Sequence, residues 1–180
     1  MGVMLFLESG MEIMVGGWTS TFVNEVLSVT PRTALIVLSL YWLGMMLARL
    51  ALGTVLRRVR PVRVLYTCIA AGIIASILLL QTSNLVVACF GVFFIGVGFA
   101  ATFPTVLGFV GDRYAELSGT AFSLVIAMAL LGGMLLPWLA GVIGGGYGMR
   151  ASFVIVPVAL IALALLLSIL SRSLRPASTV

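Results

Sequence analysis

The chain has 180 residues, of which 62% are hydrophobic and only 8% are charged. A water-soluble fold of this length cannot bury so much apolar surface, so the composition excludes a soluble protein and indicates a membrane protein. The net charge of +5 comes entirely from arginine on the basic side, and in so apolar a chain it indicates membrane topology and not nucleic-acid binding. There is no histidine, and Cys68 and Cys89 lie inside apolar stretches without ligand spacing, so we expect no metal site and no cofactor.

Six apolar stretches fill the chain, each near the roughly 20 residues that cross a bilayer. We expect crossings at residues 2–24, 33–56, 64–81, 85–110, 119–143 and 151–171. These crossings leave no room for a soluble domain. The predicted fold class is an all-α membrane protein with six transmembrane helices in a single bundle, residues 1–180, and the short connections make consecutive helices antiparallel neighbours.

Local signals mark several helix boundaries. Thr30 and Pro31 before the second crossing, and Asn84 before the fourth, are typical of helix N-termini. The run Gly144–Gly148 is expected to break the chain between the fifth and sixth crossings, because adjacent glycines carry a high entropic cost in a helix.

The placement of arginine predicts the orientation in the membrane. One side of the predicted topology holds the basic loop between the second and third crossings together with three further arginines, whereas the other side holds only Arg32 and Arg150. By the positive-inside rule the richer side is cytoplasmic, so we expect a multi-pass protein of the inner (plasma) membrane with both termini cytoplasmic. The arginines of the richer side are Arg57, Arg58, Arg60 and Arg63 in the basic loop, then Arg113, Arg172 and Arg175.

Charged residues inside the crossings are the first candidates for a site. Glu8 and Glu12 share one face of the first helix. Because a charge in hydrocarbon costs about 2.5 to 3.5 kcal/mol, we expect Glu12 to line a solute or proton pathway, and Glu8 either to join it or to be wet at the cytoplasmic interface. Arg49, near the cytoplasmic end of the second crossing, either pairs with Glu8 or extends its long side chain to the interface.

Helix-weakening residues gather in the fourth and fifth crossings. The fourth contains Thr102 and Pro104, and the fifth contains Gly132, Gly133 and Pro137. Proline leaves a backbone carbonyl unpaired and glycine lets helices approach closely, so these residues predict bends, close packing or the lining of a cavity. Ordinary packing of membrane helices is the alternative interpretation.

Three stretches carry a resemblance to a known family: residues 7–18, which contain two glutamates and a Gly-Trp pair; residues 42–63, which end in the basic loop; and residues 103–137, which run from Phe-Pro-Thr to Gly-Gly and proline. Together they resemble the C-terminal half of a major facilitator superfamily transporter, in particular the fucose-permease-like sugar porters. The resemblance implies a half-bundle of 3+3 helices and secondary active transport of a small polar solute such as a sugar. Proton coupling is a separate hypothesis from the depth of Glu12: a carboxyl group that faces the cavity is suited to carry the coupled proton. It also implies a cavity lined by the first, second, fourth and fifth crossings, with Glu12, Trp18, Asn24 and Thr102 as polar contacts. Trp18 is then either a platform for sugar stacking or a packing residue.

Members of that family have about twelve helices in two similar halves, so the resemblance implies a partner for this chain. The partner is a missing N-terminal six-helix half or a second copy in a dimer. The alternative function is that of a truncated or non-transporting membrane scaffold or assembly subunit. An enzyme is not expected, because the crossings contain no Ser/His pair, Asp dyad or metal cluster.

Overall fold

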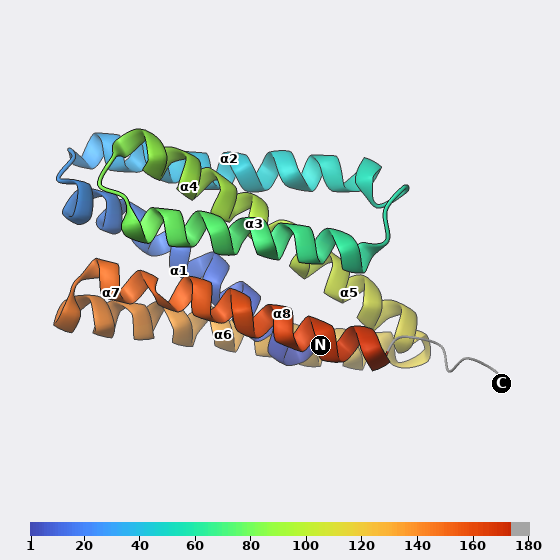
Figure 1. Cartoon of the computed structure of the whole chain (residues 1–180). Coiled ribbons are helices and arrows are strands. Elements are labelled where there is room, and N and C mark those ends of the chain that lie inside the picture. The colour runs from blue at the N-terminus through green and yellow to red at the C-terminus, as the bar shows by residue number, and fades with distance from the viewer. Residues whose placement is uncertain (174–180) are drawn as a thin grey trace.

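The computed structural model describes the backbone of residues 1–173 and the side chains of residues 1–171, and all regular structure in that range is helical. Arg175 and the side chain of Arg172, both part of the topology prediction, lie outside these ranges. The helices lie side by side in one elongated bundle (Figure 1). In chain order they are α1 Gly2–Leu27, α2 Pro31–Val55, α3 Pro61–Gln81, α4 Leu85–Phe99, α5 Thr102–Arg113, the 3-10 helix η1 Ala115–Leu117, α6 Ser118–Tyr147, α7 Met149–Phe153 and α8 Ile155–Ser173.

Most of the described chain is apolar and helical over lengths that cross a bilayer. Five segments satisfy both conditions: Pro31–Val55, Pro61–Gln81, Leu85–Arg113, Ala115–Tyr147 and Met149–Ser171. The 26-residue α1 is a sixth long helix of about 39 Å, and it carries Glu8 and Glu12. The prediction of an all-α, multi-pass membrane protein is confirmed.

The N-terminal signals of two helices act as predicted. Thr30 caps α2 by accepting a hydrogen bond from the Thr33 N–H at 3.3 Å, and Pro31 is the first residue of that helix. Asn84 caps α4, because its Oδ1 accepts from the N–H groups of Val86 and Val87 at 2.8 and 3.3 Å.

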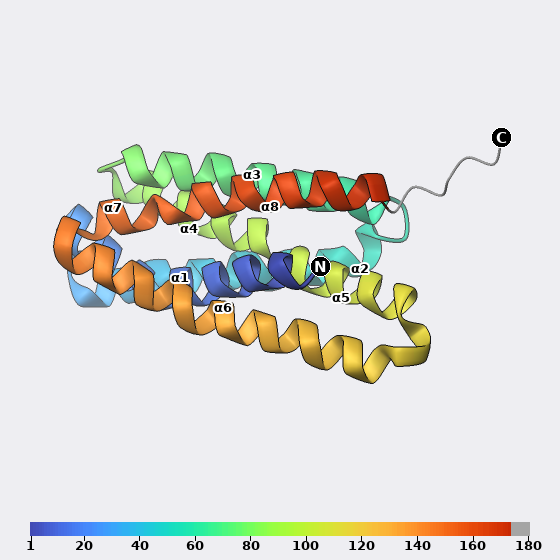
Figure 2. The ribbon, with the colours of Figure 1, turned by 90° about the horizontal axis from the view of Figure 1, so that it is seen from below.

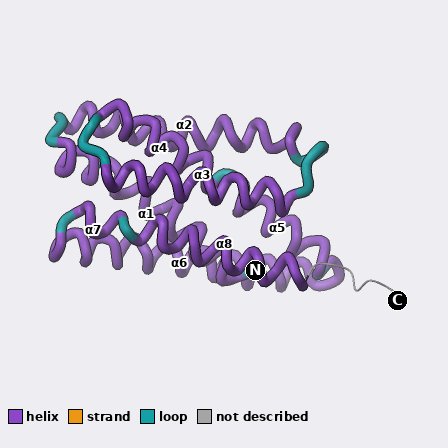
Figure 3. Tube along the Cα trace, viewed as in Figure 1, coloured by secondary structure: helices purple, strands orange, loops and turns teal. Residues whose placement is uncertain are grey.

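The fourth crossing is not the continuous helix predicted for residues 85–110. It breaks at Ala100 and Ala101, between α4 and α5. Pro104 has no N–H to donate to the Ala100 carbonyl four residues earlier, and the Ala100 N–H turns back to the Val97 carbonyl at 3.3 Å. Figure 3 shows this interruption as a short loop inside the bundle.

The chain breaks within the predicted run Gly144–Gly148, but only at its last residue. Helix α6 continues through Gly144, Gly145 and Gly146 to Tyr147, and the chain turns at Gly148, whose φ of 84° is a conformation that favours glycine. The Gly148 N–H still donates to the Gly144 carbonyl at 2.9 Å, so the helical hydrogen-bond ladder is kept to its end. The sixth crossing then divides into α7 and α8 at Val154.

Helices distant in the sequence pack along one another. α1 packs against α6, α2 against α4, and α3 against α8, an arrangement visible in Figures 1 and 2. Of the consecutive helices, α1 packs against α2 and α3 against α4, as predicted, but α2 and α3 do not pack along each other, so the prediction is wrong for that pair. The closest approaches occur at glycines. Gly132 of α6 faces the carbonyl of Phe6 in α1, and Gly44 of α2 faces the carbonyl of Phe93 in α4, with no room for a Cβ at either glycine. These contacts hold α1 against α6 and α2 against α4.

The connections divide between the two ends of the bundle. The basic loop between α2 and α3 and the turn around η1 lie at one end, and the α1–α2, α3–α4 and α6–α7 connections lie at the other (Figure 1). Arg57, Arg58, Arg60 and Arg63 are all exposed at the first end.

Candidate functional site

An ion pair joins α1 to α2 within the membrane-spanning region. Arg49 Nη2 donates to Glu12 Oε2 at 2.9 Å, with the Arg49 side chain 42% exposed and that of Glu12 19% exposed. The Tyr41 hydroxyl donates to the Glu12 backbone carbonyl at 3.2 Å and fixes the same turn of α1. The predicted pairing of Arg49 with Glu8 is therefore wrong: the partner of Arg49 is the carboxylate one turn further along α1.

Glu8 lies deeper in the protein than the sequence indicates. Its side chain is 1% exposed, so the expected position at a wet interface is wrong. Neither carboxylate oxygen has a hydrogen-bond partner among the described residues. Glu12, Arg49 and the backbone of Phe103 at the start of α5 are close enough to act on it electrostatically. A carboxyl group without compensating hydrogen bonds favours its neutral, protonated form.

Two threonine hydroxyls at the start of α5 share this lack of partners. Thr102 and Thr105 are buried, and their Oγ1 atoms have no hydrogen-bond partner among the described residues. Because α5 packs against α1, the helix break at Ala100 and Ala101 brings polar groups to the side of the bundle that contains Glu8.

Trp18 and Asn24 both use their polar groups within the protein. The Trp18 indole Nε1 donates to the Pro137 carbonyl of α6 at 3.0 Å, and its ring leaves no room for a Cβ at Gly141. This contact favours the packing interpretation of Trp18. Asn24 Nδ2 donates to the Val29 carbonyl at 2.6 Å and closes the turn after α1. Of the helix-weakening residues, Gly132 and Gly133 contact α1, and Pro104 is exposed.

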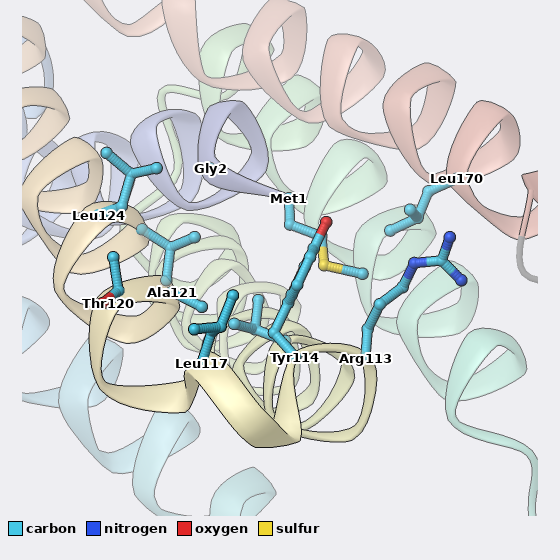
Figure 4. Close-up of a pocket in the computed structure, with 11 residues that line it drawn as sticks. Met1, Gly2, Arg113, Tyr114, Leu117, Thr120, Ala121, Leu124 and Leu170 are labelled. Atoms are coloured by element: carbon cyan, nitrogen blue, oxygen red, sulfur yellow. The ribbon is translucent and has the colours of Figure 1, made fainter.

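A cavity of about 490 Å³ lies at the end of the bundle that holds Met1. Arg113 and Tyr114 project into it beside apolar side chains, including Leu117 and Leu170 (Figure 4). None of Glu8, Glu12 or Arg49 lines it, so this cavity is separate from the intramembrane charges.

Sequence reasoning passed over two residues with defined positions. Trp42 of α2 is 47% exposed and lies against Gly16 of α1; its central place in an apolar crossing was the available signal. From the sequence, Arg150 indicates only the membrane topology. Its guanidinium donates to the carbonyls of Leu80 and Thr82 at 2.9 and 3.0 Å, and so ties α7 to the C-terminal end of α3.

Ionisable residues inside membrane-spanning helices, here an ion pair and a buried carboxyl, are typical of membrane transporters. The chain matches the model of the Major Facilitator Superfamily over residues 1–179, and it belongs to that superfamily. The family indicates a transporter and not an enzyme.

Two similar proteins illustrate the relationship. The chain is 27% identical over 142 residues to a protein of Helicobacter pylori (strain J99) that is provisionally named a glucose/galactose transporter; the match covers 77% of this chain and 34% of that protein. It is 28% identical over 137 residues to the glucose/mannose transporter GlcP of Bacillus subtilis (strain 168), covering 76% of this chain and 33% of the relative. The chain thus spans about a third of the length of the curated relatives it matches.

Proposed function

We propose that this chain is the C-terminal six-helix half of a secondary active transporter for a sugar, with proton coupling. The observation that carries the proposal is the cluster of Glu8, Glu12 and Arg49 in membrane-spanning helices. Charged groups at this depth are costly and mark solute or proton pathways. Two relatives named for glucose, galactose or mannose support a hexose as the solute.

The half-bundle is proposed to consist of 3+3 helices, residues 1–180 forming one domain. The packing supports a repeat of three crossings. In this repeat the first crossing corresponds to the fourth, the second to the fifth and the third to the sixth, and equivalent crossings make equivalent contacts. The contact of α1 with α6 corresponds to that of α4 with α2, and the contact of α3 with α4 corresponds to that of α8 with α1. The α1–α6 contact and its counterpart, the α2–α4 contact, also share a feature: Gly132 meets the carbonyl of Phe6 in the one, and Gly44 meets the carbonyl of Phe93 in the other. Internal repeats of this kind are common in transporter folds.

Within the site, Glu8 and Glu12 are assigned different tasks. Glu12 is paired with Arg49, so the pair offers a carboxylate acceptor and a guanidinium donor that can bind solute hydroxyls. Glu8 is buried without a partner and faces Glu12, Arg49 and the nearby Tyr41, so it is suited to take up and release the coupled proton. Thr102 adds a hydroxyl from α5. Trp18 and Asn24 support the site by fixing α1.

The partners are a solute, the lipid bilayer and a second six-helix bundle. The second bundle is a missing N-terminal half or a second copy of this chain, because a rocking mechanism needs two bundles around a midplane site. We place the protein in the inner (plasma) membrane with both termini cytoplasmic, which puts the four exposed arginines of the α2–α3 loop inside.

Uptake by proteoliposomes tests this function. The purified chain is reconstituted alone, and together with the N-terminal half of the Bacillus subtilis relative, under an inward proton gradient with labelled glucose, galactose or mannose. Uptake by the chain alone, with the mass of a dimer, supports the two-copy arrangement, and uptake only with the second half supports a split transporter. Absence of uptake in both cases favours the alternative, a membrane scaffold or assembly subunit.

A further inference from the structure

Trp42 lies at mid-depth in its helix. At 1.5 Å per residue it is about 17 Å from the first residue of α2 and about 20 Å from the last. Tryptophans that anchor a protein to the membrane interface lie near helix ends, at the level of the lipid headgroups. Trp138 of α6, 65% exposed and about 14 Å from the end of its helix, is closer to such a position. Trp42 is too deep for that role.

Trp42 shares a helix face with the ion pair. Arg49 follows Trp42 by two helical turns, so both residues project from the same side of α2. On the facing helix, Gly16 follows Glu12 by one turn. Glu12 contacts Arg49 and Gly16 contacts Trp42, so the seam between α1 and α2 presents a charged pair and an aromatic ring about 10 Å apart along the helices.

This face is open on the described chain. A depression of about 350 Å³ lies along it and is lined by Trp42, Met45, Met46, Arg49 and Leu50. The Trp42 indole N–H has no hydrogen-bond partner among the described residues, whereas that of Trp18 is bonded to Pro137. A half-exposed guanidinium at this depth disfavours lipid as the neighbour, because charge in hydrocarbon is costly. The face is suited to an occupant with both polar groups and an apolar surface.

We infer that Trp42 is the aromatic platform for a pyranose sugar, stacking on one face of the ring while the Glu12–Arg49 pair binds its hydroxyls. The inference rests on the proposed function and names the subsite of this half. A pyranose has an apolar C–H face and a polar rim, which match an aromatic ring beside a charged pair. Gly16 sets the height of the platform: a Cβ there would lie 2.8 Å from Cζ2 of the indole, so only glycine leaves the ring where it is.

Tryptophan fluorescence and sugar binding test the inference in the purified full chain, assembled with whichever bundle supports uptake. D-glucose, D-galactose and D-mannose are titrated, with the acyclic polyol D-mannitol as a probe without a ring. The wild-type protein is expected to change its emission with at least one hexose and not with mannitol. Trp42→Phe removes that change, while Trp138→Phe keeps it. Trp42→Leu weakens binding on the order of tenfold, which corresponds to the loss of one aromatic contact.

A glycine pair supplies the matched control. Gly16→Ala is expected to weaken hexose binding several-fold by displacing the indole, whereas Gly17→Ala, whose Cβ would meet nothing within 4 Å, leaves binding unchanged. Combined with Trp42→Leu, Gly16→Ala has no further effect. Normal hexose affinity in a folded Trp42→Leu protein overturns the platform and leaves the proposed transport intact. Absence of any hexose response and uptake in the wild-type protein overturns both.

Discussion

Arg49 of α2 and Glu12 of α1 bind each other at 2.9 Å in the membrane-spanning part of the bundle. Glu12 lies about 15 Å from the first residue of α1, too far from that end for its short side chain to reach water along the helix. Each charge therefore depends on the other for compensation. The pair also joins two helices that the connection at residues 28–30 already makes neighbours.

Removing either charge of this pair is expected to destabilise the bundle. Arg49→Gln or Glu12→Gln should lower the free energy of unfolding by about 1–3 kcal/mol, less than a fully buried pair would lose, because both side chains are partly exposed. Thermal unfolding in detergent measures the loss. The double variant should recover part of it, since it leaves no unpaired charge. Strictly additive losses would show that the two residues are not coupled.

Glu8→Gln is expected to give the opposite result for stability. The substitution keeps the volume of a side chain that is 1% exposed and replaces a buried acid that has no hydrogen-bond partner among the described residues by an amide that cannot ionise, so the melting temperature should hold or rise. Proton-driven accumulation of sugar should be lost, because the amide cannot release a proton, while exchange of sugar across the membrane continues. Accumulation and counterflow in the same proteoliposomes separate the two activities. Accumulation equal to that of the wild-type protein would exclude Glu8 as the proton site.

The close approach of α6 to α1 depends on Gly132. Gly132→Ala would place a Cβ against the backbone carbonyl of Phe6, which cannot move as a flexible side chain does. We expect a loss of about 1–3 kcal/mol, typical of overpacking, measured by thermal unfolding. Gly145→Ala in the same helix is the control, because its Cβ would meet nothing within 4 Å. Equal effects of the two substitutions would mean that helix propensity, and not the contact with α1, decides the outcome.

Arg150 provides a separate test on the opposite end of the bundle from the basic loop. The forked guanidinium of Arg150 donates hydrogen bonds to the carbonyls of Leu80 and Thr82, which lie at and just beyond the C-terminal end of α3. Arg150→Lys keeps the charge and loses the two-point geometry, so it should cost about 1 kcal/mol and loosen the α3–α4 connection. Hydrogen exchange over residues 80–86 is expected to accelerate in this variant. Unchanged exchange there would show that the fork does not hold the connection.

Much of the helical framework follows from local signals in the sequence, and the contacts of the site do not. The capping hydrogen bonds of Thr30 and Asn84 join groups only three residues apart, so these helix boundaries could be predicted from the sequence. Glu8 and Glu12 are one turn apart and equivalent partners for Arg49 in the sequence. Only the packing of α5 against α1, which buries Glu8, distinguishes them. The position of Trp42 likewise depends on its contact with Gly16 of another helix.

The orientation in the membrane is tested with single cysteines at the two ends. Val59→Cys lies among the exposed arginines of the α2–α3 loop, and Tyr147→Cys lies at the other end, where Tyr147 is 83% exposed. The positive-inside rule predicts that an impermeant maleimide labels Tyr147→Cys on intact spheroplasts and labels Val59→Cys only after permeabilisation. The native Cys68 and Cys89 lie within α3 and α4, and labelling of the unsubstituted protein measures their background.

Replacing Arg57, Arg58, Arg60 and Arg63 by Gln should make the labelling of both positions mixed, because the positive-inside rule assigns these side chains the role of keeping the loop on the cytoplasmic side. Labelling of Val59→Cys on intact spheroplasts in the otherwise native chain would reverse the topology and place the arginine-rich loop outside.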